Sequence, residues 1–164
     1  MLVRHGRIVD DPFAVVADGE PLPAGPAIVS LKRFLAEGDR LLARESALGV
    51  RVATGESPEA LAARVHRLAV VVLSIPYFKD GRAFSWARLL RTRLHYKGEI
   101  RVAGHFLRDQ IAFFARVGVD AFELTQNLSP EDVAAALDEI GNVYQPSADG
   151  RLTILDLRTR RTKS

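Results

Sequence analysis

The chain has 164 residues, of which 48% are hydrophobic and 26% charged, and this is ordinary composition for one globular domain. It contains no cysteine, which excludes disulfides, thiol catalysis and cysteine-ligated zinc or iron–sulfur centres. The longest apolar run, residues 68–73, is too short to span a bilayer, and the N-terminus lacks a signal-peptide pattern. We therefore expect a cytoplasmic protein without a membrane partner.

Charge is distributed unevenly along the chain, whose formal net charge is +3. Residues 158–164 carry +4, so the remainder is close to neutral and does not favour nucleic acid as a partner. Within that remainder, residues 79–116 sum to +6 and residues 117–157 to −7. We predict a single α/β domain over residues 1–157 and a basic flexible tail over residues 158–164.

Apolar periodicity predicts short strands that alternate with amphipathic helices. Residues 1–16 are expected to form an extra hairpin or an edge strand. The elements then expected in chain order are strand 27–30, helix 31–44, strand 49–53, helix 58–66, strand 68–73, helix 85–96, strand 99–103, helix 106–117, strand 120–124, helix 130–140 and strand 152–157. Ser57-Pro58 and Ser129-Pro130 are helix-start signals, while Gly118 and Gly141 are typical of helix ends.

Repeated strand–helix units with apolar central strands indicate an open, three-layer, mostly parallel sheet with helices on both faces. The chain is too short for a closed eight-fold barrel, which needs about 250 residues. In an open sheet of this kind, ligands bind beyond the carboxyl ends of the strands. The relevant loops are residues 74–84, 104–105 and 125–129.

The first two of these loops and the helices after them carry candidate anion ligands. Guanidinium, ammonium and helix N-terminal N–H groups all favour an anion. The candidates are Lys79, Arg82, Ser85, Arg88 and Arg108. The alternative is a turn at Asp80-Gly81, a helix cap at Ser85 and arginines on a solvated face.

His105 and Asp109 are spaced one helical turn apart, so they are candidates for catalytic acid–base chemistry, or for binding a metal together with a third ligand from elsewhere. The alternative is a loop histidine and a favourable charge in the first turn. Glu123 lies on an expected buried strand, and we predict a structural ion pair between Arg101 and Glu123.

Familiar cofactor motifs are absent from the sequence. It has no GxGxxG, GxxxxGK[ST], GxSxG or HExxH pattern, and His5, His66 and His95 lack metal-ligand spacing. We therefore expect no cofactor and no metal.

The run from Asp80 to Leu124 resembles a bacterial family of unknown function whose members are described as oxidoreductases or as accessory proteins of sulfite reduction. The family pattern is DGR-x-[YF]-S-x-A-R-x-L-R, then G-E-[LI]-R-A-x-G, then L-R-D-Q, then G-[FV]-D-[AS]-F-E-L. The matching positions are Asp80, Gly81, Arg82, Phe84, Ser85, Ala87, Arg88, Leu90, Arg91, Gly98, Glu99, Arg101, Arg108, Asp109, Gln110, Asp120, Phe122 and Glu123. The chain departs from the pattern at His95, at Val102 and at Val117-Gly118-Val119, where cysteine-glycine-phenylalanine is common.

The resemblance implies a role in assimilatory sulfur metabolism, with sulfite reductase or another sulfur-assimilation protein as partner. We therefore favour an accessory protein that binds a small anion or an acidic partner through a basic strand-end pocket. The alternative is an enzyme that uses His105 and Asp109 on an anionic, sulfate- or phosphate-bearing substrate. A third possibility is that the +6 and −7 segments neutralise each other, within one chain or across a homo-oligomer.

Overall fold

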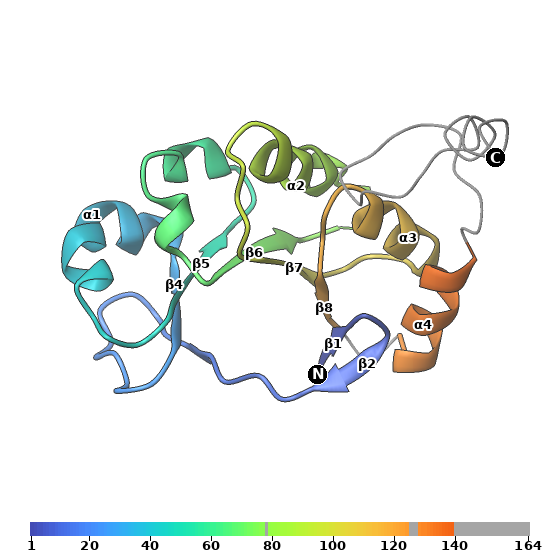
Figure 1. Cartoon of the computed structure of the whole chain (residues 1–164), viewed down its shortest axis with the longest axis horizontal. Helices are drawn as coiled ribbons and strands as arrows, with labels where there is room; N and C mark the ends of the chain where they lie inside the picture. The colour runs from blue at the N-terminus through green and yellow to red at the C-terminus, as the bar shows by residue number, and fades with distance from the viewer. Residues whose placement is uncertain (78, 125–127, 140–164) are drawn as a thin grey trace, which may run out of the picture.

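The chain forms one curled sheet of eight strands, and the computed structural model describes residues 1–77, 79–124 and 128–139 (Figure 1). The strands are β1 (Leu2–Arg4), β2 (Arg7–Val9), β3 (Ala14–Val15), β4 (Ala27–Ser30), β5 (Leu48–Val52), β6 (Val70–Ile75), β7 (Glu99–Gly104) and β8 (Ala121–Glu123). The helices are α1 (Leu31–Leu42), α2 (Arg82–Thr92), α3 (Arg108–Arg116) and α4 (Pro130–Asp138), with short 3-10 helices η1 (Pro58–Leu61) and η2 (Val65–Arg67).

The strand order is β2-β1-β8-β7-β6-β5-β4-β3. Strands β3 to β8 are parallel and follow one another in chain order, and the β1–β2 hairpin pairs antiparallel with β8. The predicted α/β class, the mostly parallel sheet and the extra N-terminal hairpin are thus confirmed. Among the described strands, β2 and β3 form two separate edges, so this part of the chain makes an open sheet.

The helices lie along the outer, convex side of the curled sheet (Figure 1). The main core combines alternate strand residues, such as Val50, Val71 and Ile100, with residues from all four α-helices. The other face has a small cluster of Ile28, Val70, Val72 and Ala103, to which no helix contributes. This differs from the expected two helical layers, because parallel strands that are neighbours in chain order, joined by crossovers of one hand, place every helix on the same side.

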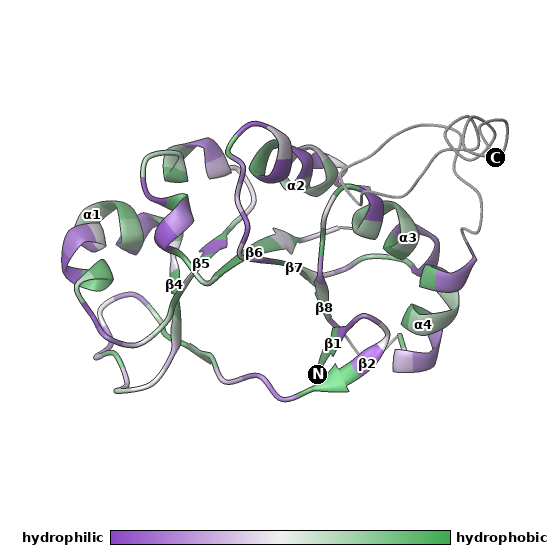
Figure 2. Ribbon diagram, in the orientation of Figure 1, coloured by the Kyte–Doolittle hydropathy of each residue, from purple (hydrophilic) through white to green (hydrophobic). Residues whose placement is uncertain are grey.

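The apolar strands and the mixed polarity of the helices are visible in Figure 2. Predicted helix starts at Ser57 and Ser129 are confirmed: Ser129 accepts a hydrogen bond from the Asp132 N–H, and Asp132 accepts one from the Ser129 N–H. The expected helix 58–66 is instead two 3-10 helices, because the chain turns out of helical geometry at Arg64. Helix α2 begins at Arg82, three residues before the predicted start.

The expected strand 152–157 and the helix end at Gly141 lie outside the described residues, as does the basic tail. None of the helices within the described part of the chain is long and apolar enough to cross a membrane.

Residues 10–26, here called the strap, cross the open side of the sheet between β2 and β4 (Figure 1). The strap forms the edge strand β3, and directly after it the Val16 N–H donates to the Ile28 carbonyl at 2.9 Å. Phe13 packs against the small apolar cluster on the concave face. The strap therefore covers a face that none of the described helices covers.

Candidate functional site

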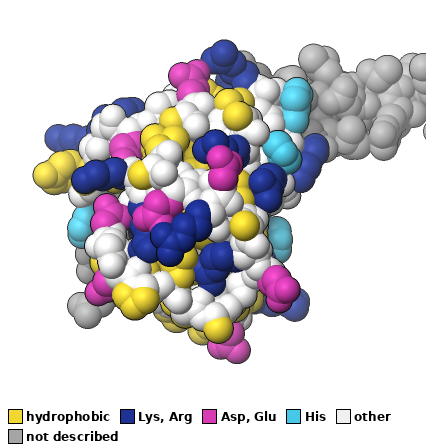
Figure 3. Space-filling model, turned by 90° about the vertical axis from the view of Figure 1, so that its left-hand side faces the viewer, with side chains coloured by type: hydrophobic (Ala, Val, Ile, Leu, Met, Phe, Trp, Pro, Cys, Tyr) yellow, Lys and Arg dark blue, Asp and Glu magenta, His cyan; other side chains and the backbone are white. Residues whose placement is uncertain are grey.

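Ion pairs are frequent on the surface of this protein. On the face that holds α1, lysine and arginine side chains lie among aspartates and glutamates (Figure 3). Arg33 and Arg40 both pair with Glu37, and Arg64 pairs with Asp39. Exposed pairs of this kind contribute little to stability, so charge alone does not identify a site.

The loops that follow β6 and β7 lie side by side at the carboxyl edge of the sheet. The His105 N–H donates to the Ile75 carbonyl at 2.8 Å and joins the two loops. Two predicted groups, Lys79 to Arg82 in one loop and His105 to Arg108 after the other strand, therefore occupy neighbouring positions. We define the strand-end surface as Tyr77, Lys79, Arg82, Ser85, Arg88, Leu107 and Arg108.

Arg82 is paired within its own loop. Its Nε and Nη2 donate to the two oxygens of Asp80 at 2.8 and 2.7 Å, and its guanidinium lies 5.8 Å from the Trp86 ring. These hydrogen bonds lower the pKa of Asp80 and raise that of Arg82. Half of the Arg82 side chain remains exposed, so the pair is a surface feature.

Arg108 connects α3 to α4. It donates to Glu139 at 2.5 Å and lies 3.9 Å from Asp132, and the hydrogen bond to Glu139 raises its pKa. A cation of the basic segment is thus neutralised by the acidic one, as the third possibility from the sequence anticipates. Ser85 and Arg88 are exposed on α2, and Arg88 forms no ion pair with another described residue.

His105 and Asp109 are both exposed at the start of α3. Within the described residues, neither side chain makes a hydrogen bond or an ion pair with the other or with a third group. The two predicted acid–base residues are therefore close in the sequence, but no hydrogen bond connects their side chains in the structure.

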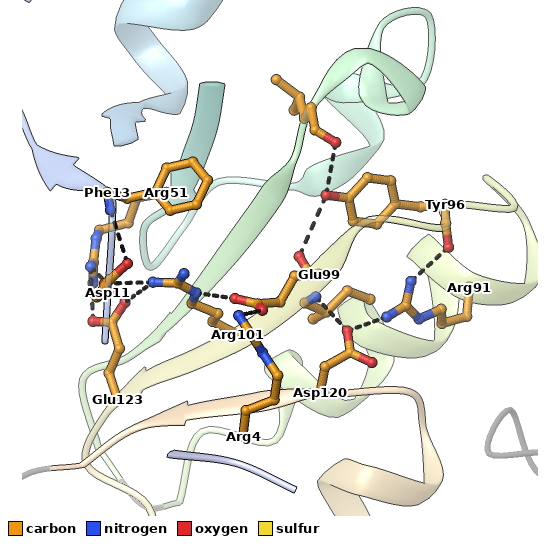
Figure 4. Close-up of polar contacts among 12 residues, drawn as sticks. Arg4, Asp11, Phe13, Arg51, Arg91, Tyr96, Glu99, Arg101, Asp120 and Glu123 are labelled. Atoms are coloured by element: carbon orange, nitrogen blue, oxygen red, sulfur yellow. Dashed lines mark hydrogen bonds and ion pairs between the residues drawn. The ribbon is translucent and has the colours of Figure 1, made fainter. Parts of the chain in front are cut away.

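A second cluster of charges lies on the concave face, centred on Arg101 of β7 (Figure 4). The Arg101 side chain is fully buried, and its Nε donates to Glu99 and its Nη1 to Asp11 of the strap at 2.7 Å. Burial lowers the pKa of Arg101, but the hydrogen bonds that it donates to Asp11 and Glu99 outweigh this and raise the pKa above its ordinary value. Arg101 is therefore held as a cation inside the protein.

Glu123, the predicted partner of Arg101, lies 4.0 Å from it, at the limit of an ion pair. Arg51 of β5 is closer and donates to both Glu123 oxygens at 3.0 and 3.2 Å. Arg4 of β1 completes the cluster by pairing with Glu99. We call these six residues the concave network: Arg4, Asp11, Arg51, Glu99, Arg101 and Glu123.

A cavity of about 500 Å³ adjoins the concave network at the carboxyl edge of the sheet. Its polar walls include Asp10, Asp11, Arg51 and Glu123. Its apolar walls include Leu2, Ile8, Val9, Ala103 and Leu124. A concave site with apolar walls and a few polar groups is the usual form of a small-molecule pocket.

Arg91 of α2 is the centre of a separate cluster, which lies near the start of β7 (Figure 4). Sequence reasoning did not identify this cluster. Its guanidinium donates to the carbonyls of Tyr96, Gly98 and Gly118 at 2.7 to 3.0 Å and to Asp120 at 2.5 Å. Asp120 also accepts from the Ile100 N–H at 2.8 Å. We call Arg91 and these partners the Arg91 clamp.

Two neighbouring features fit the Arg91 clamp. Gly118 has φ +101°, and a Cβ there would lie 2.5 Å from Cγ of Arg91, so only glycine suits the position. Tyr96 is buried beside the guanidinium at 5.7 Å, and burial raises the pKa of its hydroxyl. A cavity of about 750 Å³ adjoins the clamp, but Nε, Nη1 and Nη2 of Arg91 already donate hydrogen bonds within the clamp.

In the described part of the chain, no group of three or more histidine, aspartate or glutamate side chains could hold a metal ion.

A family model for bacterial proteins matches residues 49–155, which is more than half of the chain. The chain belongs to the family described as bacterial protein of unknown function (DUF934). No curated protein and no solved structure matches the chain. The DUF934 match covers the Arg91 clamp and Arg51, Glu99, Arg101 and Glu123 of the concave network, while Arg4 and the strap lie before it.

Proposed function

We propose that the chain is an accessory protein of assimilatory sulfur metabolism that binds an acidic protein partner through the strand-end surface. Sulfite reductase is the first candidate partner, on the strength of the sequence resemblance. The observation that supports docking is that two adjacent loops each carry an exposed apolar side chain, and that an arginine begins the helix after each loop.

Tyr77 and Leu107 are 73% and 46% exposed, and they lie in the loops that also position Arg82 and Arg108. Aromatic and arginine side chains are enriched in protein interfaces, where apolar anchors supply most of the binding energy. The arginines are themselves partly exposed, which suits the rim of an interface. An acidic partner could replace Asp80 and Glu139 as the carboxylates that Arg82 and Arg108 contact.

This geometry favours a protein over a small free anion. The cavity at the same edge of the sheet is lined by other residues, so the strand-end cations face solvent rather than an enclosed pocket. A small ion on an open surface competes with water for each contact, whereas a protein excludes that water over a wide area.

Binding to purified sulfite reductase tests the proposal, measured by surface plasmon resonance at 50 and 300 mM salt. We expect the Arg82→Ser, Arg88→Ser variant to weaken binding by about tenfold, and higher salt to weaken the wild type in the same direction. The matched control is Arg40→Ser, Arg93→Ser, which removes two well-exposed arginines elsewhere, 85% and 73% exposed. Absence of binding would refute sulfite reductase as the partner, and equal loss in both variants would refute the surface.

A small-anion site would behave differently. Titration with sulfite, sulfate or phosphate should then give saturable binding that the Arg82→Ser, Arg88→Ser change abolishes. Such a result would replace the docking proposal with direct anion binding at the same surface.

A further inference from the structure

Asp11 places a carboxylate of the strap on a fully buried guanidinium. Its Oδ2 accepts from Arg101 at 2.7 Å, and the Phe13 ring lies 5.3 Å from the same guanidinium. The strap contributes only the two-residue strand β3 to the sheet, and most of its side chains are exposed. The ion pair between Asp11 and Arg101 therefore connects the strap, which has few other contacts with the sheet, to the protein interior.

The donors of the concave network are only partly used. Arg101 Nη2 and Arg51 Nε are buried and have no hydrogen-bond partner among the described residues. Asp11 engages Arg101 through one oxygen, because its other oxygen accepts from the Phe13 N–H at 3.1 Å. A buried donor without a partner costs free energy, so a carboxylate free of the strap could bind this site better than Asp11 does.

Charge limits which ligands can enter. The concave network balances three guanidinium groups against three carboxylates, so an additional anion would leave a buried charge unpaired. A ligand carboxylate that displaces Asp11 keeps the balance. An uncharged ligand that displaced Asp11 would instead remove one carboxylate from Arg101 and put no negative charge in its place.

The adjoining cavity has room for the remainder of such a ligand. It is about 500 Å³ in volume, it includes Asp11 in its wall, and Leu2, Ile8 and Leu124 supply apolar surface. It also lies at the carboxyl ends of parallel strands, where open α/β sheets bind ligands.

We propose that the concave face binds a small organic carboxylate with an apolar body, whose anionic group displaces Asp11 from Arg101. In the structure, the Asp11 carboxylate occupies the position that the carboxylate of the ligand would take. The inference goes beyond the docking function, since no residue of the strand-end surface lines this cavity.

Removal of the Asp11 carboxylate tests the proposal in the full chain. Acetate, butyrate and benzoate, with inorganic sulfate and phosphate as the other oxyanions, are titrated by calorimetry into wild type, Asp11→Ala and Asp10→Ala. Asp10 is the matched control, because it is the neighbouring carboxylate in the cavity wall and forms no ion pair with a described residue. We expect Asp11→Ala to bind benzoate at least about tenfold more tightly than the other two proteins, and more tightly than acetate.

The same ligand should restore stability. Asp11→Ala should lower the thermal midpoint, and benzoate should raise it more in this variant than in Asp10→Ala. Asp11→Asn, which keeps the shape of the side chain, repeats the measurement should Asp11→Ala not fold. Sulfate or phosphate binding more tightly than benzoate would overturn the organic-ligand assignment, and the absence of carboxylate binding to either Asp11 variant would overturn the site.

The proposal requires that benzoate binding by Asp11→Ala depend on Arg101. Asp11→Ala combined with Arg101→Met should lose benzoate binding, with circular dichroism to confirm the fold. Arg51→Met in the Asp11→Ala background gives a second measurement, and we expect it to weaken binding by about tenfold. Unchanged affinity in both combinations would place the ligand elsewhere and overturn the proposal.

Discussion

The Arg91 clamp and the concave network each centre on an arginine, yet their partners differ in kind. Arg91 bonds mainly to backbone carbonyls, which the fold fixes in place, whereas Arg101 bonds to carboxylates from β7 and the strap. A carbonyl partner cannot leave without unfolding the segment that holds it. A side-chain carboxylate can be exchanged for another, so the first cluster is suited to stability and the second to binding.

Loss of Arg91 should have the largest effect on stability. Arg91→Met removes a donor from the carbonyls of Tyr96, Gly98 and Gly118 and leaves the Asp120 carboxylate without its cation. We expect the free energy of unfolding to fall by about 3 kcal/mol, measured by urea denaturation. Arg93, the C-cap residue of α2, forms an exposed pair with Glu59 of η1, and Arg93→Met should cost less than about 0.5 kcal/mol. Equal losses would contradict the structural role of the clamp.

Loss of Arg101 should cost somewhat less and should be partly reversible by a second change. Arg101→Met fills the buried space but leaves Glu99 and Asp11 without this cation, and we expect a loss of about 2 kcal/mol. Glu99 still pairs with Arg4, whereas Asp11 loses its ion pair, so adding Asp11→Asn removes the stranded charge and should recover roughly 1 kcal/mol. A double variant no more stable than Arg101→Met in urea denaturation would show that the carboxylates are not the source of the loss.

The regular part of the fold was predictable because local signals determine it. The five described strands from β4 to β8 follow β-branched and apolar runs, and Ser57 and Ser129 mark the starts of helical segments. Whether helices cover one face or two depends on strand order, and the alternation of strands and helices is the same in both cases. Sequence periodicity therefore indicated the α/β class but not the curled, one-sided arrangement.

The candidate site was predictable in position more than in composition. Topology predicted a site at the loops after β6 and β7, which the structure places side by side. No spacing rule in the sequence indicated Asp80 and Glu139 as the partners of Arg82 and Arg108. Asp11 lies 90 residues from Arg101 in a strap without a periodic pattern, so no local signal links them. Arg91 has the spacing of an ordinary surface arginine, and only the three-dimensional convergence of three carbonyls gives it a role.

Substitution of Tyr96 should give the smallest change in stability and is the most specific test of the Arg91 clamp. Its hydroxyl lies 3.2 Å from the Leu68 carbonyl, and we expect Tyr96→Phe to lower the free energy of unfolding by about 1 kcal/mol at pH 8. Because burial raises the pKa of Tyr96, the unfolded chain loses this proton near pH 10 while the folded chain keeps it. Wild-type stability should therefore be complete below pH 10 and should decline above it, by up to about 1.4 kcal/mol per pH unit from this group.

Tyr96→Phe removes that decline, so urea denaturation at pH 8 and pH 11 should show the variant converging on the wild type or overtaking it at the higher pH. Tyr77→Phe is the control, since Tyr77 is 73% exposed and should follow the wild type at both values. If the wild type and Tyr96→Phe lose the same stability between the two pH values, Tyr96 is not held protonated beside Arg91. The clamp would then be open to water, and its contrast with the concave network would rest on the carbonyl bonds alone.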